Sequence, residues 1–339
     1  MLTEKQIKQI RDELDNCKRP IFFFHDDPDG LASFLLFYRY IKEGRGTVVK
    51  ARPVLTEMFA EKANNYEADK IFVLDIANVE QKFIDTVKVP VIWIDHHTPV
   101  EREKVKYYNS RLNKNSNIPV SYMCHQVVKQ DEWIALVGCL GDWYIPSFFK
   151  EFAKKNPELI GKAKKIEELL FKSPIGKLVK IFSFNLKGTT TDTRTSIKIL
   201  TRIENPEEIL KQTTPKGKKI YKKYEHVNQA YEELLKKALK AKKDKIIVFT
   251  YSEDKLSLTK DLANELMYQF PDKVIVLGRE KSGEYRCSIR SNKINLTKAV
   301  EKALIGVDGY GGGHENACGA AIKKEDFKQF LKNLEKEIK

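Results

Sequence analysis

The sequence predicts an α/β protein with two sheet-containing regions. Three observations support this: short apolar runs alternate with helical patterns over residues 20–140, the alternation resumes after residue 244, and a long basic helical stretch separates the two regions. Such alternation is typical of a mostly parallel sheet with helices on both faces. We expect an N-terminal domain at 1–215, a helical connector at 216–243 and a smaller C-terminal α/β domain at 244–339.

The strands expected in the first region are almost wholly apolar, as strands covered on both faces are. A charged helical pattern over residues 1–18 precedes them. The expected strands are 20–25, 47–53, 71–75 and 90–95, and the expected helices are 30–43 and 120–130, while residues 133–140 fit a strand or a helix.

The second region repeats the alternation on a smaller scale. Its expected elements are strands 245–250, 273–278, 285–290 and 317–322, helices 258–270, 295–304 and 325–337, and a glycine-rich loop at 309–313.

The composition points to a polyanionic partner. The chain has 339 residues, is 42% hydrophobic and carries a formal net charge of +14. A basic surface of this kind favours nucleic acid. The alternative is a solvated Lys- and Glu-rich surface, as in heat-adapted proteins.

The cysteine pattern indicates a reducing compartment. The five cysteines form no Cys-x-x-Cys pair, so neither a disulfide framework nor a structural zinc site is indicated. The N-terminus has no signal-peptide core, and no apolar run approaches the roughly 20 residues of a membrane span. We expect a soluble, cytoplasmic protein without a membrane partner.

Aspartate and histidine residues follow four of the apolar runs. Ligands of open α/β sheets bind just beyond the carboxyl ends of the strands, so we expect these side chains to converge. An isolated Asp at a strand end is usually a turn or cap residue, but four such segments together favour a metal site. The residues are His25, Asp27, Asp29, Asp75, Asp95, His96, His97 and Asp142, the last placed after an apolar run at 133–140.

The first cluster has a period of two. In an extended chain the alternate residues His25, Asp27 and Asp29 would point to one side. Gly30 would let the backbone pass close to the site before the next helix.

The charge of the cluster predicts two divalent cations. Asp27, Asp29, Asp75 and Asp142 bring four negative charges, which cannot all persist together without compensation. Mixed carboxylate and imidazole ligands suit Mn²⁺, with Mg²⁺ and Co²⁺ as alternatives. Two such ions about 3.5–4 Å apart activate a water and clamp a phosphoryl group.

These motifs resemble those of the DHH phosphoesterase family. The resemblance rests on His25-x-Asp27-x-Asp29-Gly30, Asp75 and Asp95-His96-His97, in the family's order and approximate spacing. Among the branches of the family, the chain is most similar to the archaeal RecJ-like and nanoRNase-like nucleases.

The resemblance implies a role for each residue. His25 and Asp27 would hold one metal, with Asp75 bridging to the second. Asp29, His96 and Asp142 would complete that second ion. As catalytic residues, His97 would face the substrate phosphate or assist the metal site, and Asp95 would orient the histidines.

One departure from the family concerns the fourth aspartate. Bacterial members often carry it in a Thr-Asp-Thr-Gly sequence, whereas here Thr191-Asp192-Thr193 is followed by Arg194. We therefore favour Asp142 as the ligand and interpret Asp192 as a helix N-cap.

The C-terminal region resembles the DHH-associated domain of the family. Glycines at 311–313 would let backbone N–H groups converge on a phosphate, and His314 would add a donor. The alternative is a plain flexible loop. The expected substrate-binding residues are Arg290, Ser291, Gly311, Gly312, Gly313 and His314.

The predicted function is a manganese-dependent phosphodiesterase that shortens single-stranded DNA or RNA from an end or degrades short oligonucleotides. One alternative is a small-nucleotide phosphatase or cyclic-dinucleotide phosphodiesterase. The other is an accessory scaffold in replication or repair. Replication or repair proteins are also possible partners of the enzyme.

Overall fold

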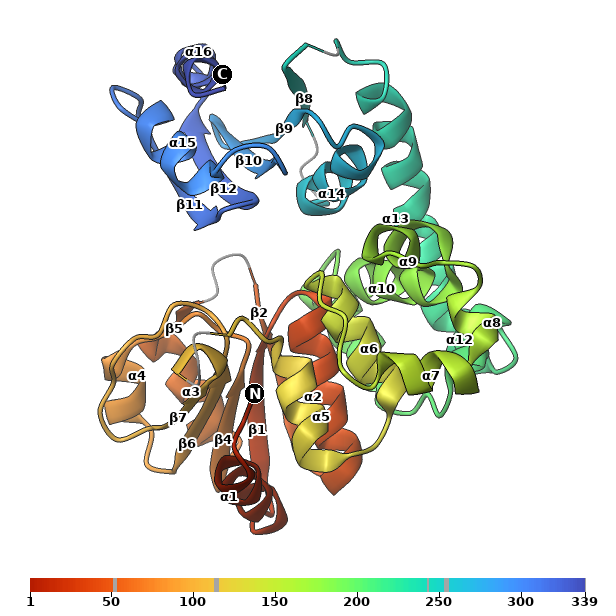
Figure 1. Ribbon diagram of the computed structural model, residues 1–339. Helices are drawn as coiled ribbons and strands as arrows, with labels where there is room; N and C mark the ends of the chain where they lie inside the picture. Colours follow the sequence, from red (N-terminus) through yellow and green to blue (C-terminus); the bar gives the residue numbers. More distant parts are fainter. Residues whose placement is uncertain (51–53, 113–115, 243, 253–255, 339) are drawn as a thin grey trace. The chain divides into compact units, whose positions relative to one another are not determined.

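The computed structural model describes residues 1–50, 54–112, 116–242, 244–252 and 256–338 (Figure 1). The chain forms two compact units, Met1–Tyr224 and Glu225–Lys339. Residues 51–53, the end of an expected strand, and residue 243, the end of the expected connector, lie outside the described residues.

The first unit is built on five parallel strands in the order β2-β1-β4-β6-β7. The chain leaves β1 for β2 on one side and returns to the other side of β1 with β4, so the order reverses beside β1. A crevice at such a reversal is the usual ligand site of doubly wound sheets. The bounds are β1 (Pro20–His25), β2 (Arg45–Val49), β4 (Lys70–Leu74), β6 (Val91–Asp95) and β7 (Lys106–Asn109).

Helices cover both faces of this sheet, as the apolar strands predicted. On one face α2 (Pro28–Ile41) packs on β1 and is contacted by α5 (Val120–Val128) and α6 (Glu132–Gly141). Phe34 of α2 contacts the rings of Phe22 and Phe24 on β1. Alternate strand residues therefore point into two separate cores.

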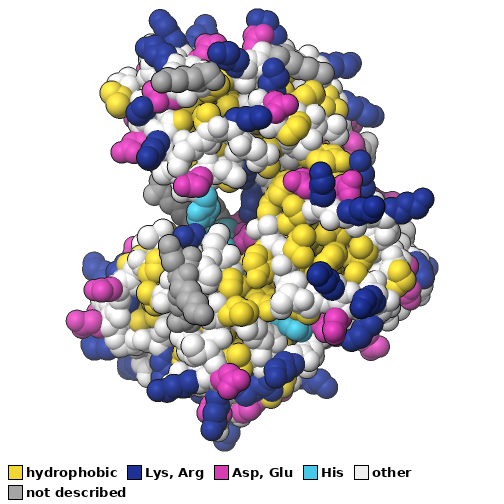
Figure 2. All heavy atoms as spheres, in the orientation of Figure 1, with side chains coloured by type: hydrophobic (Ala, Val, Ile, Leu, Met, Phe, Trp, Pro, Cys, Tyr) yellow, Lys and Arg dark blue, Asp and Glu magenta, His cyan; other side chains and the backbone are white. Residues whose placement is uncertain are grey.

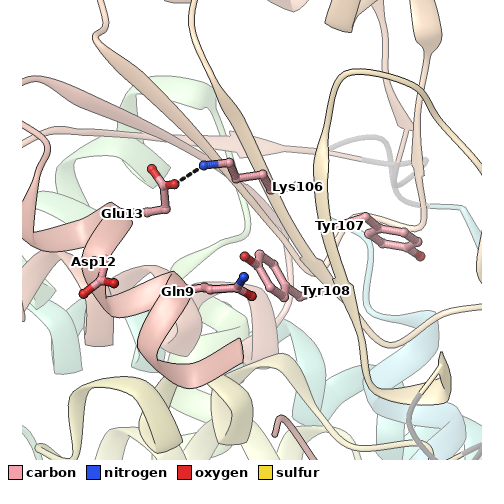
Figure 3. A pocket seen from close by; sticks show the side chains of 6 residues that line it. All are labelled: Gln9, Asp12, Glu13, Lys106, Tyr107 and Tyr108. Atoms are coloured by element: carbon pink, nitrogen blue, oxygen red, sulfur yellow. Dashed lines mark hydrogen bonds and ion pairs between the residues drawn. The ribbon is translucent and has the colours of Figure 1, made fainter. Parts of the chain in front are cut away.

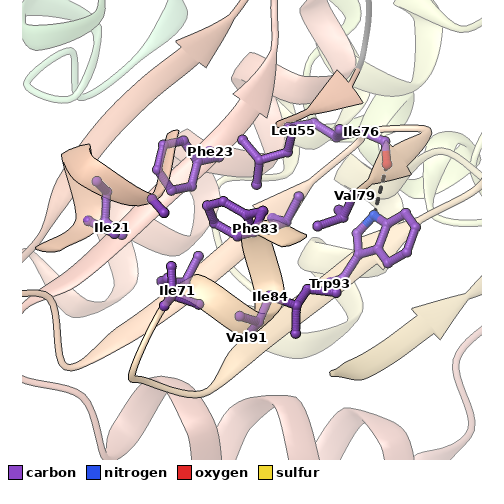
Figure 4. Close-up of a cluster of buried hydrophobic side chains, with 14 of the residues drawn as sticks. Ile21, Phe23, Leu55, Ile71, Ile76, Val79, Phe83, Ile84, Val91 and Trp93 are labelled. Atoms are coloured by element: carbon purple, nitrogen blue, oxygen red, sulfur yellow. Dashed lines mark hydrogen bonds between the residues drawn. The ribbon is translucent and has the colours of Figure 1, made fainter. Parts of the chain in front are cut away.

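The opposite core joins β1, β4 and β6 to the short helices α3 (Ala60–Asn65) and α4 (Gln81–Thr86) (Figure 4). Phe83 of α4 meets Phe23 edge to face, with ring centroids 5.8 Å apart. The indole N–H of Trp93 donates to the carbonyl of Ile76 at 2.8 Å, so this large side chain is buried without losing a hydrogen bond. A small parallel pair, β3 (Val54–Leu55) and β5 (Asn78–Val79), lies beside this core.

The remaining elements of the first unit are helical. An expected N-terminal helix is present as α1 (Glu4–Asp15), which begins at a capping box on Thr3. The others are η1 (Glu57–Phe59), η2 (Ser110–Leu112), α7 (Phe149–Lys155), α8 (Pro157–Ile160), α9 (Ile166–Lys172), α10 (Pro174–Asn185), α11 (Thr190–Leu200), α12 (Pro206–Leu210) and α13 (Pro215–Ala238).

The long basic helix is α13, and its buried residues recur at helical spacing, including Ile220, Tyr224, Val227 and Tyr231. The division between the two compact units falls inside this helix, after Tyr224. The boundaries 1–215, 216–243 and 244–339 remain a prediction. Among the described helices, none has the length and apolar character needed to cross a bilayer.

The apolar run before Asp142, which fits either a strand or a helix by sequence, is a helix in the structure. Residues 132–141 form helix α6, and Asp142 is its C-cap. Eight consecutive residues of this helix, Trp133 to Leu140, are buried. A helix that is apolar all round gives the same sequence pattern as a buried strand.

The second unit contains a five-stranded mixed sheet in the order β11-β12-β10-β9-β8. Only β8 and β9 run parallel. One face packs on α15 (Leu296–Ala303) and α16 (Phe327–Lys336), while α14 (Thr259–Gln269) contacts β9 and β10. The strands are β8 (Ile246–Ser252), β9 (Val274–Lys281), β10 (Glu284–Arg290), β11 (Gly309–His314) and β12 (Ala317–Lys323).

The glycine-rich segment is a strand rather than the expected loop. All six residues of β11 are exposed, and the strand pairs with β12 at the edge of the sheet. A Cβ on Gly313 would lie 2.4 Å from the carbonyl oxygen of Ala317, and its φ is +150°. Glycine is needed there for close pairing.

We expect Phe83→Ala to lower the free energy of unfolding of the first unit by about 3–5 kcal/mol, because it leaves a cavity in the core of Figure 4. Tryptophan fluorescence during urea unfolding measures this, since all three tryptophans, Trp93, Trp133 and Trp143, belong to this unit. The control is Met58→Ala, at a side chain 82% exposed, which should change stability by less than about 0.5 kcal/mol. Equal effects of the two substitutions would contradict this core assignment.

Candidate metal centre

The predicted ligands converge at the carboxyl edge of the parallel sheet, beside the point where the strand order reverses. His25 ends β1, Asp75 directly follows β4, and Asp95 ends β6 with His96 next to it. β1 and β4 are neighbours, as are β4 and β6, so their ends lie side by side. The sheet itself therefore assembles these side chains.

One group of possible ligands consists of His25, Asp27 and Asp75, whose ligand atoms all lie within 4.8 Å of one another. Nδ1 of His25 is 3.0 Å from Oδ2 of Asp27 and 3.4 Å from Oδ2 of Asp75. Asp27 is also the N-cap of α2 and accepts a hydrogen bond from the backbone N–H of Gly30 through its other oxygen. The cap fixes this carboxylate while one oxygen still faces the group.

The extended-chain argument for this segment is correct only as far as Asp27. Helix α2 starts at Pro28, so Asp29 and Gly30 already belong to its first turn. The close approach predicted for Gly30 is confirmed, because a Cβ there would lie 2.6 Å from the carbonyl oxygen of His25. A tight strand-to-helix turn, rather than strand alternation, brings Asp29 to the site.

A second group consists of Asp29, His96 and Asp142, again with ligand atoms within 4.8 Å. Nε2 of His96 is 3.3 Å from Oδ2 of Asp142. Asp29 is fully buried and accepts hydrogen bonds from the N–H groups of Val120 at 2.8 Å and Ser121 at 2.9 Å. The N-terminus of α5 thus stabilises and orients this carboxylate.

Asp75 links the groups. Its side chain is 1% exposed, and Oδ1 lies 3.2 Å from Nε2 of His96 while Oδ2 faces His25. Among the described residues, the groups that face these two oxygens are the imidazoles of His25, His96 and His97, and no backbone N–H or hydroxyl donates to them. The backbone adopts a left-handed conformation, with φ of 58°, which is uncommon for non-glycine residues although aspartate and asparagine adopt it more often than the others.

The donor set fits divalent cations. A buried carboxylate is costly unless a cation pairs with it, and either a metal ion or a protonated imidazole supplies that charge. Carboxylate oxygens and imidazole nitrogens together suit Mn²⁺ and related ions. Asp75 has one oxygen toward each group, as a ligand shared between two ions would need.

His97 and His96 are oriented by different residues. Nδ1 of His97 is 2.7 Å from Oδ1 of Asp95, which also accepts the backbone N–H of His97 at its other oxygen. Nδ1 of His96 instead lies 2.9 Å from Oδ1 of Asn117. Among the described residues, Asp95 contacts the ring of His97 but not that of His96. The expectation that it orients both histidines therefore applies to His97 alone.

The sequence reasoning missed the supporting residues. Besides Asn117, they include Asn109, whose amide donates to Asp95 and to the carbonyl of His97, and Arg111, which donates to the carbonyl of His96. Asn109 is the last residue of β7, a strand that was not predicted from the sequence. A polar residue at the end of that strand was the signal that could have identified Asn109 as part of the site. Asn117 belongs to no strand or helix, and no sequence signal marks it.

The local charges shift the pKa values strongly. Burial alone would lower the pKa of His25, but Asp27 and Asp75 raise it well above the ordinary value. Burial alone would also lower the pKa of His96, but Asp75 and Asp142 raise it well above its ordinary value. For Asp29, burial first and then the carboxylates of Asp75 and Asp142 raise the pKa. Without metal, the surrounding carboxylates therefore favour the protonated forms of His25 and His96, at positions where a metal would bind.

Asp192 lies outside the ligand groups found among the described residues. It is exposed in the first turn of α11 and forms a reciprocal capping box with Thr189. The N-cap itself is Thr189, so the predicted capping cluster is present with the roles of the two residues exchanged.

The predicted substrate-binding residues of the second unit differ in accessibility. Arg290 is buried, its guanidinium donates to Asn264 and to backbone carbonyls, and burial lowers its pKa to about 10. Ser291 is fully buried. By contrast Gly311, Gly312, Gly313 and His314 are all exposed on β11. A Cβ on Gly312 would meet no atom within 4 Å, so that position faces open space.

The first unit also has a hollow of about 330 Å³ whose lining charges are paired (Figure 3). It lies between α1 and β7 and is lined by Gln9, Asp12, Glu13, Lys106, Tyr107 and Tyr108. Glu13 is paired with both Lys70 and Lys106, which overcome the effect of burial and lower its pKa. The charged side chains at this hollow therefore compensate one another, whereas the metal centre has an excess of carboxylates.

Two family models match the chain. The DHH family, N-terminal domain, matches residues 21–135, and the DHHA1 domain matches residues 244–339. The chain belongs to the DHH phosphoesterase family. No curated protein sequence matches it.

Solved structures share the fold of this DHH protein. The RecJ of Thermus thermophilus in complex with Mn²⁺ is 15% identical, with a TM-score of 0.66 over 98% of this chain and 54% of that one. A manganese-bound exonuclease RecJ is 15% identical, with a TM-score of 0.64 and coverage of 99% and 94%. The DHH domain of a protein described as a member of a ribosomal protein family is also 15% identical, with a TM-score of 0.66 and coverage of 98% and 89%. The chain thus spans about half the length of the Thermus protein.

We expect metal binding to strengthen as pH rises from about 6 to about 8. His25 and His96 have raised pKa values without metal, so a divalent ion must displace protons from these imidazoles. Titration calorimetry with Mn²⁺, in buffers of different ionisation enthalpy, should report net proton release. Heats that do not depend on the buffer would contradict the protonated site.

We expect Asp95→Asn to lower kcat on a phosphodiester about 10- to 100-fold, because His97 loses the carboxylate that holds its ring. The assay is hydrolysis of bis(p-nitrophenyl) phosphate with Mn²⁺, and circular dichroism checks the fold. Asp85→Asn, on an exposed side chain of α4, is the matched control. Full activity of Asp95→Asn would show that this carboxylate does not support His97.

Proposed function

We propose that the chain is a two-metal phosphodiesterase that removes nucleotides from an end of single-stranded DNA or RNA or degrades short oligonucleotides. The observation that carries this is Asp75, a buried carboxylate with one oxygen toward His25 and the other toward His96, a residue of the second ligand group. Mn²⁺ is the proposed ion, with Mg²⁺ and Co²⁺ as alternatives.

The proposed ligand roles follow the two groups. His25 and Asp27 hold one ion, Asp29, His96 and Asp142 hold the other, and Asp75 contributes to both. The negative charges of the four aspartates match the +4 of two divalent ions, which removes the repulsion among them. When bound, such ions lower the pKa of a coordinated water and neutralise charge on the phosphate.

The protein groups around the ligands have their own proposed tasks. Asp95 holds Nδ1 of His97, so we assign the opposite nitrogen of this ring, Nε2, to a substrate oxygen. The His97 side chain is 23% exposed, compared with 7% for His96. We assign His97 to contact the phosphate, and His96 to the metal.

A polyanionic substrate is supported by the surface charge. Figure 2 shows Lys and Arg side chains over much of the visible face, in keeping with the net charge of +14. The exposed glycine strand β11 with His314 offers backbone groups and a donor without side chains in the way. We propose that these residues, with Arg290 and Ser291 supporting the strand end, bind a terminal nucleotide.

We expect Asp75→Ala to reduce turnover at least about 100-fold, because both proposed ions lose a ligand. The assay uses purified protein, Mn²⁺, and end-labelled single-stranded DNA and RNA of two to about thirty nucleotides. Asp85→Ala, an exposed aspartate of the same unit, should behave like the wild type.

The products separate the candidate functions. A ladder of shortened strands supports the exonuclease, and turnover confined to the shortest substrates supports an oligonucleotide scavenger. Hydrolysis only of mononucleotides or cyclic dinucleotides would favour the small-nucleotide alternative. No turnover of any phosphodiester would favour the scaffold. Turnover by Asp75→Ala above about a tenth of the wild type would contradict the shared-ligand role.

A further inference from the structure

Lys50 lies at the same sheet edge as the metal centre. It directly follows β2, which pairs in parallel with β1 so that Val49 is opposite His25. The carboxyl ends of neighbouring parallel strands open onto one crevice, so Lys50 borders the turn that carries the first ligands. Its ammonium also interacts with the charge of Asp26, the neighbour of His25.

Two half-buried lysines meet on one face of α11. Nζ of Lys50 donates to Oγ1 of Thr193 at 3.0 Å and to the carbonyl of Gly188 at 3.1 Å. Nζ of Lys223, on α13, donates to Oγ of Ser196 at 3.2 Å and to the carbonyl of Asn185 at 2.7 Å. Thr193 and Ser196 are three residues apart and therefore neighbours on the helix surface. The two ammonium groups are close enough for the charge of Lys50 to lower the pKa of Lys223.

Neither ammonium group of this pair forms a close ion pair with a carboxylate of the described residues. All the partners that hold the two ammonium groups among the described residues are uncharged hydroxyls and carbonyls. Asp26 attracts Lys50 and Asp192 attracts both lysines from a distance, whereas Lys187 repels Lys50. Burial, and then Lys50, lowers the pKa of Lys223 to about 8. Partly buried charges without a counter-ion are costly unless a ligand supplies one.

We propose that Lys50 and Lys223 form a subsite for a non-scissile phosphate of the substrate strand, beside the metal centre. The inference rests on the proposed function. Lysine ammonium groups bind phosphate as point charges, and the hydroxyls and carbonyls of α10 and α11 keep both groups in place. The subsite favours substrates with at least two phosphates, because the metal centre takes one and the lysines take the next.

The test compares substrates that differ in phosphate number. The variants are Lys50→Met, Lys223→Met and the double variant, and the substrates are bis(p-nitrophenyl) phosphate, with one phosphate, and a trinucleotide. We expect each single substitution to raise KM for the trinucleotide about fivefold and the double substitution about thirtyfold, well above the change for the single-phosphate substrate. Lys82→Met, at an exposed lysine of α4, is the charge-matched control and should match the wild type.

A binding measurement needs no turnover. Anisotropy of a fluorescein-labelled trinucleotide in EDTA, across a salt series, should show weaker binding by the double variant. The slope of log K against log salt should be shallower by about 1.4, or about 0.7 for each lost contact. Thermal unfolding completes the set, since lysines that only support α11 would lower the melting temperature when replaced.

The outcomes distinguish the two levels of the proposal. Equal KM changes for both substrates, or unchanged trinucleotide binding and salt slope, would overturn the subsite. A lower melting temperature with an unchanged substrate ratio would make the lysines structural and would also overturn it. If the wild type hydrolyses neither substrate but the double variant still loses salt-dependent binding, the phosphate subsite stands and the proposed function fails.

Discussion

The confinement of negative charge at the carboxyl edge of the parallel sheet is the constraint on which the site depends. Asp27, Asp29, Asp75 and Asp142 meet there, with Asp75 almost fully buried. Without metal, the protein offsets this charge with protons on His25 and His96 and with the N-terminal amides of α5 on Asp29. The packing of the sheet against its helices positions both the histidines and the amides of α5. The rigid, doubly covered core is therefore what keeps like charges together.

The same core explains why the ligand positions are spread so widely in sequence. Val120 donates to Asp29 across 91 residues, and Asp142 reaches the site from the end of a buried helix. Helix α6 contacts α2, the helix that begins with Asp27 as its cap. A small shift of α6 against α2 would move Asp142 relative to Asp29, so the packing of two apolar helices sets the geometry of a polar site.

Much of the fold was predictable because strands covered on both faces leave long apolar runs with polar residues at their ends. This placed β1, β4 and β6, together with Asp75 and Asp95-His96-His97. The same rule left α6 open between a strand and a helix, since a helix buried all round has no polar face to reveal its period. It failed for β11, whose glycines carry no side chains to show strand alternation. Asn117 and the amides of α5 act through tertiary contacts, which a single sequence does not encode locally.

The glycine strand has a consequence for the behaviour of the protein in solution. In the described part of the chain, β11 is the outer strand of its sheet, and it lacks the lysines, prolines or bulges that usually protect such an edge. Its backbone is a template for strand pairing between molecules. The net charge of +14 opposes that encounter through repulsion between copies, and added salt screens it over about 10 Å at 0.1 M. The colloidal stability of the protein should therefore decline as ionic strength rises, unless a bound polyanion covers the edge.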